Sequence, residues 1–155
     1  MKRLVFLRHG KTEGTERHLY YGATDLPLLD TGVRELREAA ARGAYPKPDG
    51  FSFVTTGMLR TNQTLRAIYG DVPFSVIEAL REVNFGIFEM KCYDSLKNKP
   101  LYQAWLSNDW FSNTPPGGES FRDAEARLLR GLASLLSREE DTVCVCHGGT
   151  ILTAM

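Results

Sequence analysis

The sequence has no net charge and no long apolar run. Its 155 residues contain 19 Lys and Arg against 19 Asp and Glu, so we expect no bulk attraction to nucleic acid or to an anionic membrane. No apolar run approaches the ~20 residues that a membrane span requires. The short apolar run at residues 4–7 ends at Arg8, and no cleavage site typical of a secretion signal follows it. These absences predict a cytoplasmic protein.

Cysteine is also scarce. Cys92, Cys144 and Cys146 make an odd count, which argues against a framework of disulfides. The run Cys144-x-Cys146-His147 superficially suggests a metal site, but the sequence offers no second cluster of ligands. Free cysteine is commonly a small apolar core residue, so we expect no metal and no other cofactor.

Apolar patterning alternates between strand-like and helix-like segments. Strands are expected at residues 5–7, 51–54, 74–77 and 142–146, and helices at residues 30–42, 58–69 and 121–136. Asp30 or Thr31 is expected to cap the first of these helices, and Ser120 with Asp123 forms a capping-box signature before the last. Residues 83–119 are expected to be irregular apart from one helix near 101–106. The alternation predicts one α/β domain over residues 1–155, a three-layer α/β/α fold with a mostly parallel sheet.

Polar residues follow three of the expected strands. Arg8, His9 and Gly10 follow the first strand, Arg60 lies one turn beyond the second, and His147 follows the last. In open parallel sheets ligands bind outside the carboxyl ends of the strands, so these side chains are expected to meet at one edge.

Two imidazoles and two guanidinium groups are suited to phosphoryl transfer. Arginine grips phosphate oxygens through paired N–H donors, and a neutral histidine can attack phosphorus and carry the phosphoryl group. The leaving alkoxide then needs a proton, for which Glu82 is the candidate acid. Taken singly, each residue has a plainer interpretation: a histidine at a strand end is often a capping residue, Arg60 a solvated helix residue, and Glu82 an exposed loop charge.

Six blocks of sequence together resemble one family. They are Leu4-Val5-Phe6-Leu7-Arg8-His9-Gly10-Lys11-Thr12, Tyr21-Gly22-Ala23-Thr24-Asp25-Leu26-Pro27-Leu28, Leu59-Arg60-Thr61-x-Gln63-Thr64, Leu80-Arg81-Glu82-x-x-Phe85-Gly86-x-Phe88-Glu89, Pro116-Gly117-Gly118-Glu119-Ser120 and Val145-Cys146-His147-Gly148-Gly149. In this order they resemble the histidine phosphatase superfamily, which has the phosphoglycerate mutase-like fold. The resemblance spans nearly the whole chain.

The resemblance implies a role for each candidate residue. His9 would be the phosphorylated nucleophile, Glu82 the proton donor, and Arg8, Arg60 and His147 would bind the phosphoryl group. Apart from the resemblance, the backbone amides of Gly10, Gly148 and Gly149 are expected to add neutral donors to a phosphate, because glycine lets the backbone approach closely. Thr15 stands where many relatives have an asparagine that contacts phosphate, so a weakened contact is expected there.

The resemblance also implies a metal-independent phosphomonoester hydrolase. The blocks around residues 85–90 and 102–110 look most like alpha-ribazole phosphatases, which act late in cobalamin biosynthesis on a small phosphorylated metabolite. A phosphoglycerate mutase-type phosphotransferase and an inactive phospho-ligand-binding protein remain the alternatives. Relatives usually continue with a helix and often a strand after the second histidine, whereas only residues 150–155 follow here. Exposed apolar edges would then favour a homo-oligomer.

Overall fold

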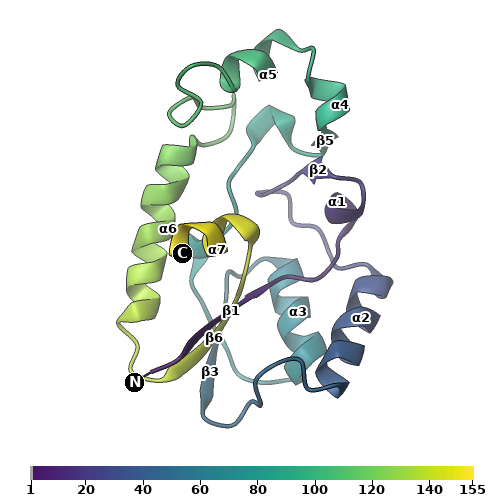
Figure 1. Ribbon diagram of the computed structural model, residues 1–155, viewed down its shortest axis with the longest axis vertical. Coiled ribbons are helices and arrows are strands. Elements are labelled where there is room, and N and C mark those ends of the chain that lie inside the picture. Colours follow the sequence, from purple (N-terminus) through teal and green to yellow (C-terminus); the bar gives the residue numbers. More distant parts are fainter. Residues whose placement is uncertain (1) are drawn as a thin grey trace.

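A four-stranded parallel sheet forms the centre of the computed structural model, which describes residues 2–155. Its strands lie in the order β1–β6–β3–β4 (Figure 1). Their bounds are Leu4–Arg8 for β1, Phe51–Thr55 for β3, Ser75–Val76 for β4 and Asp141–Cys146 for β6. All three pairings are parallel, as the alternation of strands and helices predicts.

Helices cover both faces of this sheet. On one face, Leu4, Phe6 and the two cysteines of β6 pack against α6 (Phe121–Leu136) and α7 (Gly148–Ala154). On the other face, Val143 and Val145 pack with Leu65 of α3 (Leu59–Tyr69), and α2 (Asp30–Ala41) lies against α3. Because successive strand residues point to opposite faces, the continuous apolar strands fill two cores. The three-layer α/β/α architecture is therefore confirmed (Figure 1).

A smaller aromatic part lies beyond the carboxyl ends of the strands (Figure 1). It contains α1 (Glu13–Glu16), the antiparallel pair β2 (Leu19–Tyr20) and β5 (Lys91–Cys92), α4 (Tyr93–Leu96) and α5 (Pro100–Trp105). Two single turns of 3₁₀ helix, η1 (Glu78–Leu80) and η2 (Gly86–Phe88), precede β5. The buried core of this aromatic part consists of Phe88, Leu96, Tyr102 and Trp105.

Two expectations about helices differ from the structure. The N-cap of α2 is Leu29, without a side-chain hydrogen bond, and Asp30 is the first helical residue. A carboxylate in the first turn still faces the positive end of the helix dipole, which explains why the pattern resembles a cap. In residues 83–119 the expected helix near 101–106 is present as α5, but η2, β5 and α4 accompany it, because aromatic packing rather than periodic patterning stabilises these short elements. By contrast, Ser120 does cap α6 by accepting a hydrogen bond from the Asp123 amide at 3.0 Å.

Within residues 2–155, no helix has the length and the apolar character needed to cross a membrane.

The packing of α6 generates a stability prediction. Leu135 is 1% exposed in the core, whereas its neighbour Leu136 is 61% exposed. Leu135→Ala is expected to lower the free energy of unfolding by about 2–5 kcal/mol because it leaves a cavity, and Leu136→Ala by less than about 0.5 kcal/mol. Urea denaturation of both variants measures the difference. Equal losses would show that α6 does not pack on the sheet through this face.

Candidate active site

The parallel pairing of β1 with β6 brings two histidines together. Arg8 lies opposite Cys146 in the register, and the His9 amide donates to the Cys146 carbonyl at 3.0 Å. The residue after each strand is a histidine, and the ring centroids of His9 and His147 lie 5.3 Å apart in an edge-to-face arrangement. The predicted meeting of these side chains at the sheet edge is therefore observed.

The ring of His9 is held as a neutral imidazole with a defined tautomer. Its Nδ1 lies 2.8 Å from the carbonyl oxygen of Gly10, and a carbonyl only accepts, so Nδ1 carries the proton. Burial lowers the pKa of His9 to about 4 against the opposing effect of this hydrogen bond, and the charges of Arg60 and Arg8 lower it further. At neutral pH the Nε2 lone pair is thus free to act as a nucleophile.

His147 is completely buried behind His9. Its Nε2 lies 2.9 Å from the hydroxyl of Thr56, which follows β3. Burial, reinforced by the charge of Arg60, lowers the pKa of the His147 ring to about 2. Its Nδ1 is buried and has no hydrogen-bond partner among the described residues.

Arg60, in the first turn of α3, is also completely buried. Its guanidinium donates to the carbonyls of Thr24 at 3.0 Å and of Gly22 at 2.9 Å, and lies 5.1 Å from the ring centroid of Tyr21. Burial lowers its pKa from the usual value. Its Nε has no hydrogen-bond partner within the part of the chain that the structure describes. Because native proteins rarely leave buried polar groups unsatisfied, the unpaired Nε–H of a buried guanidinium is typical of a binding site for an anion.

Glu82 is held by two backbone amides. Val83 N–H donates to Glu82 Oε1 at 3.0 Å, and Gly149 N–H, in the first turn of α7, donates to Oε2 at 3.1 Å. A Cβ on Gly149 would lie 2.3 Å from Glu82 Oε1, so only glycine allows this approach. The carboxylate therefore depends on both the 82–83 segment and the start of α7.

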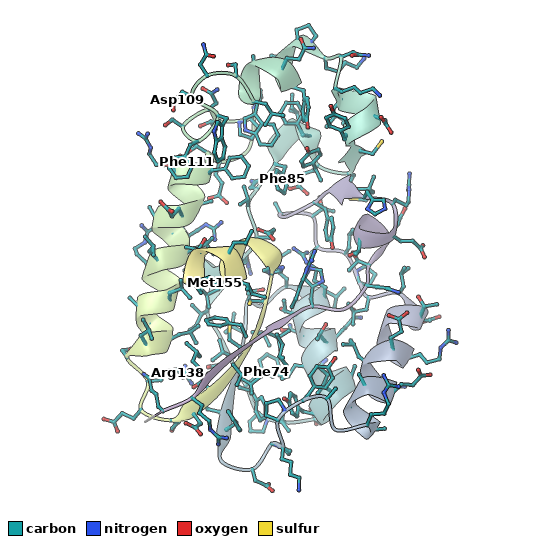
Figure 2. All side chains as sticks on the ribbon, in the orientation of Figure 1. Phe74, Phe85, Asp109, Phe111, Arg138 and Met155 are labelled. Carbon is teal, nitrogen blue, oxygen red and sulfur yellow. The ribbon has the colours of Figure 1, made fainter. Side chains whose placement is uncertain are left out.

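A cavity of about 550 Å³ opens beside these groups. Arg8, His9, Glu82, Gly148 and Gly149 line one end of it. The rest is mostly apolar and aromatic, formed by Leu19, Tyr20, Tyr21, Val83, Phe85, Trp110, Phe111, Phe121, Ala124, Leu128 and Leu152. Figure 2 shows Phe85 and Phe111 in the upper half of the molecule, where α6 approaches the aromatic part. The cavity thus joins a polar end at the sheet edge to an apolar wall.

The three expected substrate-binding residues have different surroundings. Gly148 lines the cavity, but the Gly10 amide already donates to Thr64 Oγ1 at 2.9 Å. Thr15 does not line this cavity, and its hydroxyl lies 2.8 Å from that of Tyr21. Thr15 instead lines a neighbouring cavity together with Arg8, His9 and Gly10, so its weak phosphate contact stays a prediction.

Sequence patterns did not assign a role to Thr56, Thr64 or Tyr21. In the sequence, Thr56 is simply a polar residue at the end of a strand, yet its hydroxyl contacts His147. Thr64 lies one helical turn after Arg60, and its hydroxyl donates a hydrogen bond to the Arg60 carbonyl at 2.7 Å. Nothing local in the sequence indicates which distant atom each hydroxyl contacts.

Within residues 2–155, the structure gathers no group of three His, Cys, Asp or Glu side chains that could hold a metal ion.

The sequence profile of the histidine phosphatase superfamily (branch 1) matches residues 4–155. The chain belongs to this superfamily. Among curated relatives, it is 32% identical over 164 residues to the 2,3-bisphosphoglycerate-dependent phosphoglycerate mutase of Rhizobium etli, covering 97% of this chain and 77% of the mutase. It is 29% identical over 158 residues to the adenosylcobalamin/alpha-ribazole phosphatase of Escherichia coli, covering 96% of this chain and 75% of that protein.

Solved structures of the superfamily share the fold. A candidate alpha-ribazole-5'-P phosphatase from Escherichia coli superposes with a TM-score of 0.85 at 27% identity, over 97% of this chain and 75% of that one. A phosphoglycerate mutase from Thermus thermophilus superposes with a TM-score of 0.75 at 28% identity, over 97% and 80% of the two chains. The phosphoglycerate mutase-like architecture expected from the sequence is therefore confirmed.

Because its pKa is lowered, the His9 ring is expected to become protonated only at acidic pH. In NMR spectra of ¹⁵N-labelled protein, His9 is expected to show the Nδ1–H tautomer at pH 7 and to titrate near pH 4. The urea-unfolded protein is the control, with a midpoint near 6.5. Because the unfolded chain binds this proton at higher pH, the free energy of unfolding is expected to fall as pH drops from about 6.5 towards 4. A folded-state midpoint near 6.5 would contradict the burial of the ring.

Arg60 should not tolerate lysine. The carbonyls of Gly22 and Thr24 accept from different nitrogens of the guanidinium, and a single ammonium cannot reproduce both bonds and also keep a correctly placed N–H for an anion. Arg60→Lys is expected to reduce kcat/KM for a phosphate ester by about 100-fold, and Arg60→Ala by at least as much. The exposed Arg66→Lys on the same helix is the matched control and should stay near the wild-type value. A near-normal rate for Arg60→Lys would remove Arg60 from the site.

Proposed function

We propose that this histidine phosphatase hydrolyses phosphate monoesters through a phosphohistidine at His9, without a metal or other cofactor. The observation that carries the proposal is the neutral His9 ring close to the charge of Arg60, whose buried Nε–H is an unsatisfied donor. A nucleophile and donors for a multiply charged anion are thus provided at one point. The remaining steps follow from the neighbouring groups.

In the first step, His9 Nε2 attacks phosphorus as the bond to the ester oxygen breaks. Arg8, Arg60 and His147 stabilise the charge on the transferring phosphoryl oxygens. The Glu82 carboxyl group, at the same end of the cavity, gives a proton to the leaving alkoxide. This step yields a phosphorylated His9 and a free alcohol.

In the second step, water attacks the phosphorus of phosphohistidine. Glu82, now a carboxylate, takes the proton from this water as the P–Nε2 bond breaks. The products are inorganic phosphate and the original neutral His9. The amides of Val83 and Gly149 donate to the Glu82 side chain and keep it in position between the two steps.

The charges around the cavity favour hydrolysis over a mutase reaction. Among the described residues that line the cavity, Arg8 is the single permanent cation, whereas Glu82 and Glu125 are both acidic. A phosphoglycerate carries a carboxylate besides its phosphate, and a buried charge without a partner is costly. The lining therefore supports a substrate with one anionic group.

The apolar wall supports a bulky, largely apolar alcohol half. Most residues beyond the polar end are aliphatic or aromatic, including Phe85, Trp110 and Phe111. Such surfaces bind planar rings by stacking and by area burial. Alpha-ribazole phosphate is thus our first candidate substrate, in keeping with the names of similar proteins, and would place the enzyme in cobalamin biosynthesis.

Turnover of an aryl phosphate in excess EDTA tests the proposal. Wild-type protein is expected to release phosphate, and His9→Ala is expected to lose essentially all of this activity while keeping its thermal unfolding midpoint. A phosphomonoester panel that includes alpha-ribazole phosphate then identifies the alcohol half. Release of phosphate by His9→Ala at the wild-type rate would defeat the proposal.

Similarity to phosphoglycerate mutases makes phosphotransfer the second candidate. Interconversion of 2- and 3-phosphoglycerate faster than hydrolysis of any ester in the panel would favour it. Binding of inorganic phosphate by folded protein without turnover of any substrate would instead indicate a phospho-ligand-binding protein.

A further inference from the structure

The carboxylate of Glu89 lies at the centre of a cluster of uncharged donors. Both of its oxygens lie within 3.1 Å of the Gly22 amide, and the amides of Ala23 and Thr24 each donate to it at 3.1 Å. The Thr24 hydroxyl donates at 2.6 Å and the Phe85 amide at 3.0 Å. Burial raises the pKa of this carboxyl, but these hydrogen bonds outweigh burial and lower the pKa below its usual value. Glu89 therefore binds as a carboxylate and joins the 22–24 loop to the 85–89 segment.

The 22–24 loop also binds Arg60, through carbonyl oxygens instead of amides. The peptide unit between Gly22 and Ala23 donates its N–H to Glu89 Oε1 and accepts from Arg60 Nη2 through its carbonyl at 2.9 Å. The Thr24 carbonyl accepts from Arg60 Nη1 at 3.0 Å. The dipole of the Gly22–Ala23 peptide unit thus has its positive end at the Glu89 carboxylate and its negative end at the Arg60 guanidinium. Hydrogen bonds aligned in this way strengthen one another.

We propose that Glu89 is a positioning residue that acts through the 22–24 loop to fix the guanidinium of Arg60 at the phosphoryl site. The proposal rests on the phosphoryl-transfer function given above. Glu89 does not line the cavity that contains His9 and Glu82, so its effect on catalysis passes through the loop carbonyls. The loop has little freedom to compensate, because a Cβ on Gly22 would lie 1.6 Å from the Val83 carbonyl oxygen.

Loss of the Glu89 charge should disturb the loop and Arg60 together. In Glu89→Gln an amide NH₂ replaces one oxygen and faces backbone N–H groups that need an acceptor. The loop carbonyls would then no longer converge on Arg60. Because a charge held for the transition state affects kcat more than ground-state binding, the loss is expected mainly in kcat.

A double-mutant cycle tests whether Glu89 acts through Arg60. Wild type, Glu89→Gln, Arg60→Lys and the double variant are compared by kcat and KM on an aryl phosphate. Glu89→Gln is expected to lower kcat about tenfold in the wild-type background and less than about twofold when Arg60→Lys is present. Multiplicative losses in the cycle would overturn the proposal.

Glu119→Gln is the matched control. This carboxylate also accepts from a backbone amide, that of Asn84 at 3.0 Å, and pairs with Arg127, but it makes no contact with the 22–24 loop among its recorded hydrogen bonds. Its effect is expected to multiply with that of Arg60→Lys. If Glu89→Gln fails to fold by thermal denaturation, Thr24→Val replaces it, since that change removes one donor to Glu89 and should show the same coupling with a smaller loss.

Calorimetric binding of inorganic phosphate to the same variants separates this inference from the proposed function. If wild type binds phosphate but turns over no ester, the proposed function fails. The coupling between Glu89 and Arg60 is then measured from the affinity of each variant for phosphate. Weaker phosphate binding by Glu89→Gln in the wild-type background alone would support the positioning role. If Glu89→Gln weakened phosphate binding equally in wild type and in Arg60→Lys, the positioning role would be refuted.

Discussion

The pairing of β1 with β6 is the constraint on which the rest of the site depends. Parallel strands end at the same edge of a sheet, and here the register places Arg8 opposite Cys146. The residues that follow, His9 and His147, are separated by 138 positions in sequence yet have ring centroids 5.3 Å apart. A slip of one residue would turn a histidine towards a helix layer, and the apolar faces of both strands oppose such a slip.

Burial next to fixed positive charge gives the two imidazoles their chemistry. Each would be partly protonated near pH 6.5 in water, but desolvation, reinforced by Arg60, lowers the pKa of both. The folded protein therefore keeps neutral imidazoles beside fixed positive charge, as the proposed mechanism requires. Arg60 donates to the carbonyls of Gly22 and Thr24, and the amides of the same loop donate to Glu89. The strands, α3 and one short loop together position the side chains of the proposed anion site.

Sequence reasoning was most accurate where pattern and topology coincide. Strands such as 142–146 have continuous apolar runs, and residues placed directly after them must lie at one edge of a parallel sheet, so His9 and His147 could be predicted together. The helix near residues 101–106 was predicted and is present as Pro100–Trp105, whereas the short helix at Tyr93–Leu96 was not predicted, because packing against the aromatic core rather than periodic patterning defines it. The anchoring role of Glu89 was equally invisible, since its partners are backbone amides, which any sequence supplies.

The most direct test of the account is identification of the phosphorylated residue. Glu82→Gln should slow water attack, so rapid mixing with an aryl phosphate followed by alkaline quenching should accumulate a phosphoenzyme. Peptide mass spectrometry is expected to find one phosphoryl group, stable to base and labile to acid, on Nε2 of His9. A phosphoryl group on any other residue, or no phosphoenzyme in a folded variant that still releases the alcohol in a burst, would contradict His9 as the nucleophile.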